Sequence, residues 1–275
     1  MLKLEETIVF GFEPAIRGMR NPKNSWEKSD SQILGSAIRY DEDNKRWEDR
    51  GYEIKIGPND LQLMKSLASG GPVHAKYRRM IVVYVDITAP LYWWKEFDTY
   101  RVGVTPNPTD IEINSCSTMH KIQAKEFTLE DFSTEHLIRN WNGDNGDSVA
   151  YVKNPLGVDE FAFTPFEILR ATINALNTNR DAYLNVTEHL KNDMDRETML
   201  KLQSKQKGYW WQMIQLLPTS YNQKRTIMLN YEVLAGIYPM RKDHKLYEWH
   251  TFCEWIEQLP YAKDIIIGDE AHFHE

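Results

Sequence analysis

The sequence predicts an α+β fold, and two segments support this prediction best. Residues Met80 to Ile87 form a nearly continuous run of β-branched and apolar side chains, which is typical of a buried strand. Thr164 is followed by Pro165 and Glu167, which together supply an N-cap, a proline at the first helical position and a capping-box glutamate. Strand patterns fall mostly in the first half of the chain and helix patterns in the second.

The first 60 residues have weaker signals. An apolar run from Thr7 to Phe12 indicates a strand, and the segment from Ser29 to Tyr40 is interpreted as a helix. Apolar residues at helical spacing then predict a helix from Asp60 to Leu67, which the glycines at 70 and 71 should end. After the strong strand, the alanine and proline at 89 and 90 should break the extended chain. An aromatic-rich helix is expected from Leu91 to Tyr100.

Two stretches rich in turn-forming residues are expected to be exposed excursions. Residues 102–113 contain two prolines, and residues 140–151 contain a dense run of Asn, Asp and Gly. Such a run can bind calcium, but its spacing does not fit the roughly twelve-residue loop with a closing glutamate, so a plain loop is the preferred interpretation. Thr128 and Asp131 resemble the capping motif of a short helix.

The second half predicts a series of helices. The Thr164 cap begins a helix whose apolar stripe includes Ile168 and Leu176. Further helices are expected over residues 181–191, 196–217, 225–235 and 246–258. His272 and His274 in the charged tail suit either a metal site or a frayed end, and a frayed end is the preferred interpretation. No linker or repeat divides the sequence, so a single domain of residues 1–275 is expected.

The composition is typical of a globular protein and argues against several classes. The formal net charge of −7 is unsuited to broad electrostatic capture of nucleic acid. No apolar run approaches the roughly 18 residues of a membrane span. The two cysteines, Cys116 and Cys253, lie far apart and in no metal-type spacing, so neither a disulfide framework nor a metal site is expected. We therefore expect a cytoplasmic protein without a membrane or nucleic-acid partner.

Two segments of the chain resemble one known family in order and spacing. In that family a Gly-His pair ends a helix, a strand follows, and the next helix ends in Gln-x-x-Arg-His-Arg, with Asn-Glu-x-Ser-x-Arg-Tyr soon afterwards. Here His74, the strand from Met80 and the run from Glu96 to Arg101 follow without a gap, and Ser117 stands in the later motif. The loop between Arg101 and Asn114 is longer than in the family pattern.

The second segment contains Pro218, Asn230 and Arg241 at the intervals that the same family shows for its Leu-Pro, Asn-x-Arg and Leu-Arg-x-Asp motifs. Together the segments resemble the flavin-dependent thymidylate synthases. The resemblance implies a central, mostly antiparallel sheet flanked by helices, with a helical second half. It also implies a homotetramer whose sites lie between subunits, for which the tryptophans at 93, 94, 210 and 211 are candidate contacts.

The resemblance also assigns candidate site residues. It implies that Arg101, Ser117 and Arg241 bind a pyrimidine nucleotide, with Arg241 beside the base as the cation that stabilises charge on the ring. It implies that His74 and Asn230 contact the cofactor FAD, which supplies the hydride chemistry. Each residue also has an ordinary interpretation: an arginine in a surface ion pair, a serine that caps a helix, a histidine with local hydrogen bonds. We expect Arg101, Ser117 and Arg241 to converge on one pocket.

Several family cations are replaced in this sequence. Thr99 and Tyr100 stand for the first Arg and the His of Arg-His-Arg, and Glu232 stands for the Arg of Asn-x-Arg. Met119 and Ile214 replace two more arginines. Because these positions contact flavin or phosphate in the family, we expect FAD to bind weakly or not at all. Four nearby cations are candidates to compensate: Lys76, Arg78, Arg79 and Lys95.

These observations predict a thymidylate synthase-like protein that binds a pyrimidine nucleotide. The preferred interpretation is an enzyme that acts on dUMP or a related nucleotide with a rewired site, as a methyl or one-carbon transferase. The alternatives are a catalytically inactive nucleotide-binding protein and a scaffold protein on the same fold.

Overall fold

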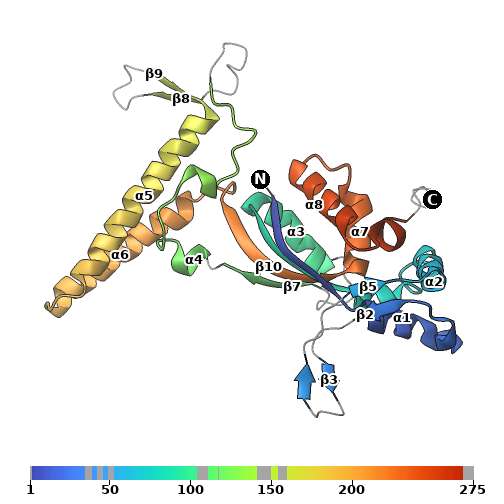
Figure 1. The fold of residues 1–275 in the computed structure, drawn as a ribbon. Helices are drawn as coiled ribbons and strands as arrows, with labels where there is room; N and C mark the ends of the chain where they lie inside the picture. Colours follow the sequence, from blue (N-terminus) through green and yellow to red (C-terminus); the bar gives the residue numbers. More distant parts are fainter. Residues whose placement is uncertain are drawn as a thin grey trace. The chain divides into compact units, whose positions relative to one another are not determined.

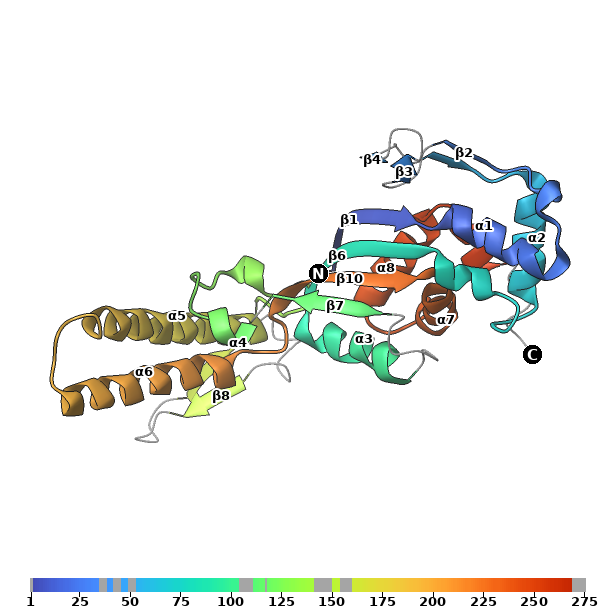
Figure 2. The same ribbon diagram turned by 90° about the horizontal axis from the view of Figure 1, so that it is seen from below.

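A four-stranded sheet forms the centre of the larger of two units into which this computed structural model divides (Figures 1 and 2). One unit comprises residues 2–88, 95–114 and 224–275, and the other residues 89–94 and 115–223. The expectation of a single domain stays a prediction. The structure describes residues 2–34, 39–41, 46–48, 53–103, 111–116, 118–140, 150–153 and 160–268.

The strand order in this sheet is β1 (Lys3–Phe10), β6 (Val82–Pro90), β10 (Asn222–Asn230) and β7 (Glu112–Ser115). β1 pairs antiparallel with β6, with Lys3 opposite Thr88 and Phe10 opposite Val82. β6 also runs antiparallel to β10, because Tyr231 N–H donates to the Ile81 carbonyl at one end and Thr226 Oγ1 donates to Asp86 Oδ1 midway. The predicted α+β class and its central antiparallel sheet are confirmed.

The strand predicted at Met80 to Ile87 is confirmed as β6, in the middle of the sheet. Val83, Val85 and Ile87 alternate on its buried face. The strand continues through Ala89 and Pro90, the two residues that were expected to break it. The helix α3 (Leu91–Gly103) begins at the next residue, where a helix was predicted to start. The helix also extends past Tyr100 to Gly103, into the expected 102–113 loop, and β7 occupies the end of that loop.

The remaining described elements of this unit are short ribbons, helices and turns. Two-stranded ribbons are formed by β2 (Gln32–Leu34) with β5 (Glu53–Lys55) and by β3 (Arg39–Asp41) with β4 (Arg46–Glu48). The helices are α1 (Phe12–Arg20), α2 (Pro58–Ser69), α7 (Tyr231–Arg241) and α8 (Tyr247–Gln258), with short 3₁₀ turns η1 (Asn21–Lys23), η2 (Trp26–Lys28) and η3 (Lys76–Met80) and a π-helical turn η7 (Lys263–Ile267). Aromatic rings join α3 to α8: Phe97 stacks on Trp249 at 6.3 Å.

The other unit is built on a long helical hairpin of α5 (Pro165–His189) and α6 (Arg196–Leu216). Thr164 caps α5 through Glu167 as predicted. The base of the hairpin packs on a cluster formed by Ile122, Phe127, Phe132, Leu169, Ile173, Leu176 and Met213. The smaller elements are α4 (Thr118–Lys121), the capped turn η5 (Leu129–Asp131) and the ribbon of β8 (Ala150–Lys153) with β9 (Glu160–Phe163).

Three predicted helices are wrong in the structure. Where the structure describes the segment expected as a helix from Ser29 to Tyr40, it contains strands β2 and β3 instead, and Ser29 and Ser31 hydrogen-bond to Asp60. Residues 225–230 belong to strand β10, since Ile227 and Leu229 alternate into the core and the helix starts only after the Asn230 cap. No separate helix begins at Asp181, because α5 runs unbroken to His189.

Other expectations have mixed outcomes. Helices α2, α6 and α8 agree with the predicted ranges within a few residues. Trp93 and Trp94 are buried inside the chain, at 0% and 1% exposed, so they are not available as subunit contacts. Most of the 140–151 excursion, and the two tail histidines, lie outside the described residues. Within the described part of the chain, no helix is long and apolar enough to cross a membrane, and no three metal-ligating side chains gather.

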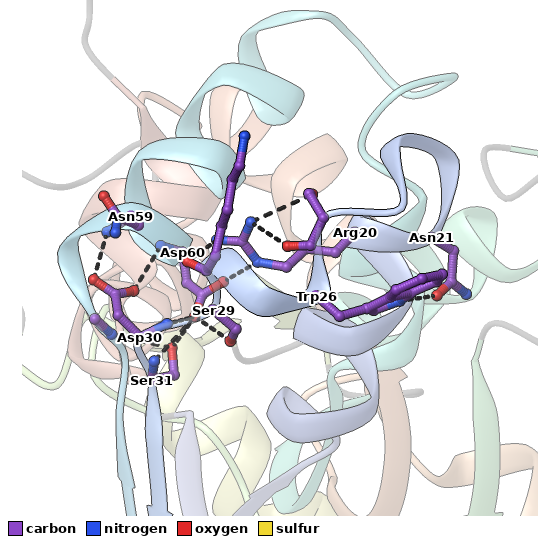
Figure 3. A network of polar contacts seen from close by, with 11 residues as sticks. Arg20, Asn21, Trp26, Ser29, Asp30, Ser31, Asn59 and Asp60 are labelled. Atoms are coloured by element: carbon purple, nitrogen blue, oxygen red, sulfur yellow. Dashed lines mark hydrogen bonds and ion pairs between the residues drawn. The ribbon is translucent and has the colours of Figure 1, made fainter.

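A buried carboxylate fixes the position of α2 (Figure 3). Asp60 Oδ1 accepts from Arg20 Nε at 2.6 Å, and Asp60 Oδ2 accepts from the hydroxyls of Ser29 at 2.7 Å and Ser31 at 2.6 Å. The Asp60 side chain is 0% exposed and that of Arg20 4%. Burial raises the pKa of Asp60, but the hydrogen bonds from Ser31, Ser29 and Arg20 outweigh it and hold that pKa below its ordinary value. The carboxylate therefore stays charged and ties α1, the start of β2 and α2 together.

Replacing Asp60 with alanine should lower the free energy of unfolding by about 3–5 kcal/mol, since the Arg20 guanidinium is left buried without its carboxylate. Urea denaturation followed by circular dichroism measures this. The matched control is Glu188→Ala, which removes a surface partner of Lys191 and should change stability little. Equal losses in the two variants would contradict a structural role for the Asp60 network.

Candidate functional site

A pocket of about 780 Å³ opens between α2, the first turns of α7 and η7, all in the unit that holds the sheet. This volume is within the range of small-molecule sites. Among the described residues that line it, Lys65, Arg78 and Lys263 are cationic, and Glu232 and Asp264 are acidic. The lining therefore has a formal charge of +1, although the whole chain has −7. A ligand with an anionic group suits this wall better than a cationic ligand does.

Arg78 and Glu232 face each other in this wall. Arg78 comes from η3, immediately before β6, and Glu232 from the first turn of α7. Arg78 Nη1 lies 3.5 Å from Glu232 Oε2, and the two side chains are 11% and 14% exposed. The resemblance assigns an arginine to the position of Glu232. This position on α7 is therefore negative where the family has a positive charge, and a guanidinium comes from η3 instead. Of the four candidate compensating cations, Arg78 lines this pocket.

Two further contacts shape the same pocket. Lys65 on α2 pairs with Asp264 of η7 at 2.5 Å, which joins the two elements across the pocket wall. Tyr77, next to Arg78, is buried and donates its hydroxyl to the Met64 carbonyl at 2.9 Å. Burial raises the pKa of Tyr77 to about 12, so its hydroxyl stays protonated and the contact to α2 persists at neutral pH.

His74 and Asn230 lie near this pocket in different ways. His74 is exposed and packs against Gly70, next to the Gly71 that lines the pocket. Asn230 is 4% exposed, and its Oδ1 accepts from Val233 N at 3.0 Å as the N-cap of α7. Asn230 therefore has a structural role as the residue that begins α7. Their predicted contacts with a cofactor stay predictions.

Arg241 lies elsewhere, at the last turn of α7. Nine residues separate it from Glu232, which is roughly 14 Å along a helix. Its Nη1 binds Glu96 Oε2 at 2.9 Å, its Nε donates to the Tyr100 hydroxyl, and its guanidinium lies 4.5 Å from the Trp249 ring centroid. These contacts engage both its charge and one face of its planar group.

Glu96 is the common acceptor of this cluster. Besides Arg241, its Oε2 accepts from Trp249 Nε1 at 3.1 Å and lies 3.4 Å from His244 Nε2. His244 Nδ1 accepts from Leu246 N at 3.1 Å, so a neutral ring has its proton on Nε2, the nitrogen that lies near Glu96. Burial raises the pKa of Tyr100, against the opposing effect of Arg241, so the phenol remains a neutral acceptor and donor. The cluster joins α3, α7 and α8.

The predicted convergence of three residues stays a prediction. The Arg101 side chain and Ser117 lie outside the described residues, so their approach to Arg241 is untested. The sequence analysis included Arg78 among the cations that could compensate for the lost family arginines. It gave no signal for Lys65, Lys263 and Asp264, because α2 and the C-terminal turn lie outside both family-like segments.

Neither protein-family models nor curated proteins match the sequence. Solved structures are similar to it. Thymidylate synthase X from Helicobacter pylori, determined with FAD and dUMP, is 13% identical, with a TM-score of 0.52 and 100% of each chain covered. The chain has the flavin-dependent thymidylate synthase fold.

Two other structures show weaker likeness to the chain. A second structure of the Helicobacter pylori enzyme, complexed with FAD and dUMP, is 14% identical with a TM-score of 0.49, over 95% of this chain and 98% of that one. The UMP/dUMP methylase PolB from Streptomyces cacaoi, bound with 5-Br dUMP, is 11% identical with a TM-score of 0.47, over 94% of this chain and 88% of that one.

Three side chains at the family's flavin-contacting positions do not fit a flavin dinucleotide. Thr99 donates its hydroxyl to the Glu96 carbonyl at 2.6 Å, Tyr100 is 3% exposed and bonded to Arg241, and Glu232 is an acid. A pyrophosphate needs cationic or N–H donors, and an acid in the pocket wall repels it. These positions therefore offer none of the cationic contacts that the resemblance implies.

Proposed function

We propose that this protein binds a pyrimidine nucleotide, dUMP or a related compound, in the pocket between α2, α7 and η7. The observation that carries the proposal is the pocket itself: a cavity of about 780 Å³ with a cationic excess, at the start of α7, on the flavin-dependent thymidylate synthase fold. The resemblance relates Asn230 and the position of Glu232 to cofactor contacts; Asn230 is the N-cap of α7, and Glu232 lies in its first turn and lines the pocket. A nucleotide supplies both the anion and the flat ring that such a pocket suits.

We further propose that the protein acts on this nucleotide as a transferase with a rewired site, in a cytoplasmic homotetramer. The resemblance implies that Arg241 stabilises negative charge on the base. Arg241 is not among the residues that line this pocket, so in this proposal the base extends beyond that lining toward the end of α7. The Arg241 guanidinium already donates to the Tyr100 hydroxyl and to Glu96. To reach the base it has to break one of these two hydrogen bonds and form a new one to the ligand. The chemistry does not use flavin in this proposal, because the contacts at Thr99, Tyr100 and Glu232 disfavour the dinucleotide.

A second candidate function is an inactive nucleotide-binding or scaffold protein, and one observation favours it. Arg241 is held by an acid, a phenol and an indole ring of its own chain, which is the environment of a structural arginine. Binding without turnover would then leave this cluster intact. Product analysis separates the two candidates, because only an enzyme converts the nucleotide.

Blocking the pocket should abolish nucleotide binding. A side chain added at Gly236, which lines the pocket, meets no atom within 4 Å, so Gly236→Phe fills the cavity without a clash at its Cβ. We expect isothermal titration calorimetry to show saturable dUMP binding to the unaltered chain and none to the variant. Gly208→Phe on α6 is the matched control, because a Cβ there is equally unobstructed, and it should bind as the unaltered chain does. Equal binding by Gly236→Phe would place the ligand elsewhere.

Ordinary thymidylate synthesis should be absent. Freshly purified protein, and protein incubated with excess FAD, should show no flavin absorption after desalting, since the cationic contacts are replaced. With dUMP, methylene-tetrahydrofolate and a reduced nicotinamide, mass spectrometry should detect no thymidylate. A yellow protein that forms thymidylate at rates ordinary for enzymes would overturn this expectation. A modified nucleotide other than thymidylate would support the enzyme over the inactive alternative.

A further inference from the structure

The Arg78 guanidinium is poorly satisfied for a buried cation. Arg78 is 9% exposed, and its Nε finds no hydrogen-bond acceptor in the described part of the chain. Its contact with Glu232 is 3.5 Å long, whereas charge-assisted N–H···O bonds are usually about 2.7–2.9 Å. An unmet buried donor of this kind is costly to a folded chain and calls for an explanation.

The same unit shows what a satisfied buried arginine looks like. Arg20 binds Asp60 through Nε at 2.6 Å and the carbonyls of Ser25 and Lys28 at 3.2 and 3.1 Å. Each nitrogen of that guanidinium therefore has an oxygen partner. Arg20 is not among the residues that line this pocket, but Arg78 is, so the two arginines differ in both hydrogen bonding and access to a ligand.

We propose that Arg78 is the anchor for an oxyanion in this pocket, with Glu232 as the internal anion that the ligand displaces. The identity of the oxyanion, the phosphate of a pyrimidine nucleotide, rests on the proposed function. Because Nε itself is covered, the side chain turns toward the pocket as the oxyanion binds, and the long Glu232 contact is the one that breaks. Lys65 and Lys263 in the same lining add attraction for an anion.

Glu232 then sets the affinity and the selectivity of the site. Its carboxylate competes with an incoming oxyanion for the guanidinium and also repels it. A compact monophosphate needs only one cation for its charge, whereas the longer pyrophosphate of a dinucleotide also lies close to the Glu232 carboxylate and is repelled by it. The arrangement therefore favours a nucleoside monophosphate over a dinucleotide cofactor.

The test is calorimetric titration with inorganic phosphate, dUMP and deoxyuridine. Arg78→Met should weaken phosphate and dUMP binding about tenfold or more, the scale of a lost bond to a charged group, and should leave deoxyuridine binding unchanged. Glu232→Gln should tighten phosphate and dUMP binding, since the competing charge is gone. In the double variant the gain from Glu232→Gln should vanish, because both effects act through one guanidinium.

Arg79→Met is the matched control. Arg79 follows Arg78 on η3, and its Nε also has no acceptor within the described ranges, but it is not among the residues that line the pocket. It should bind phosphate as the unaltered chain does. Equal weakening by Arg78→Met and Arg79→Met, or weaker binding by Glu232→Gln, would overturn the proposal. If Arg78→Met does not fold, the Glu232→Gln titration decides alone: tighter phosphate binding supports the anchor and any other result rejects it.

The three titrants also separate this inference from the proposed function. If phosphate binds through Arg78 while dUMP and deoxyuridine do not bind, the anchor stands and the nucleotide proposal fails. If dUMP binds equally to the unaltered chain and to Arg78→Met, the nucleotide proposal stands and the anchor fails.

Discussion

The hydrogen bond from Tyr231 N–H to the Ile81 carbonyl, at 3.0 Å, is the contact on which the pocket depends. It joins the end of β10 to the start of β6, the two central strands of the sheet. Arg78 precedes Ile81 by three residues, and Glu232 follows Tyr231 directly. Sheet pairing between segments some 150 residues apart therefore sets a guanidinium opposite a carboxylate. Asn230 strengthens the junction, because its side chain caps α7 at the residue where the strand ends.

The other walls of the pocket are fixed by buried polar contacts. Asp60 holds α2 by accepting from Arg20, Ser29 and Ser31, and the Tyr77 hydroxyl bonds to Met64 on the same helix. The Lys65–Asp264 ion pair ties α2 to the C-terminal turn. These contacts make a preformed cavity rather than one that a ligand has to assemble. Preorganisation of this kind reduces the ordering cost of binding.

Local sequence patterns correctly predicted the elements that are determined by the residues within them. The β-branched run gave β6, and the Thr164 cap gave the start of α5. The prediction failed where tertiary contacts decide. Ser29 and Ser31 serve Asp60, which lies about 30 residues away, so the helix expected there does not form. Residues 225–230 have apolar spacing that suits a helix or a strand, and pairing with β6 selects the strand.

The candidate site shows the same division. Family-like spacing identified Asn230, Glu232 and Arg241 as one group, but α7 separates Arg241 from the pocket by most of its length. No local pattern places Lys65 or Asp264 there, because their meeting depends on the packing of α2 against η7. The departures from the family motif are also coupled in space: the acid at Glu232 meets the cation at Arg78, and Tyr100 and Glu96 both meet Arg241. Lost cationic contacts are thus accompanied by new internal pairs.

The central claim is that a nucleotide phosphate engages Arg78 in this pocket. The most direct measurement follows the Nε–Hε resonance of Arg78 by nitrogen-15 NMR, assigned with the Arg78→Met variant, while dUMP is added. The account predicts that this signal shifts and saturates together with the calorimetric binding curve, because its donor gains an acceptor. An Arg78 signal that stays in place while resonances elsewhere in the chain respond to dUMP would contradict it.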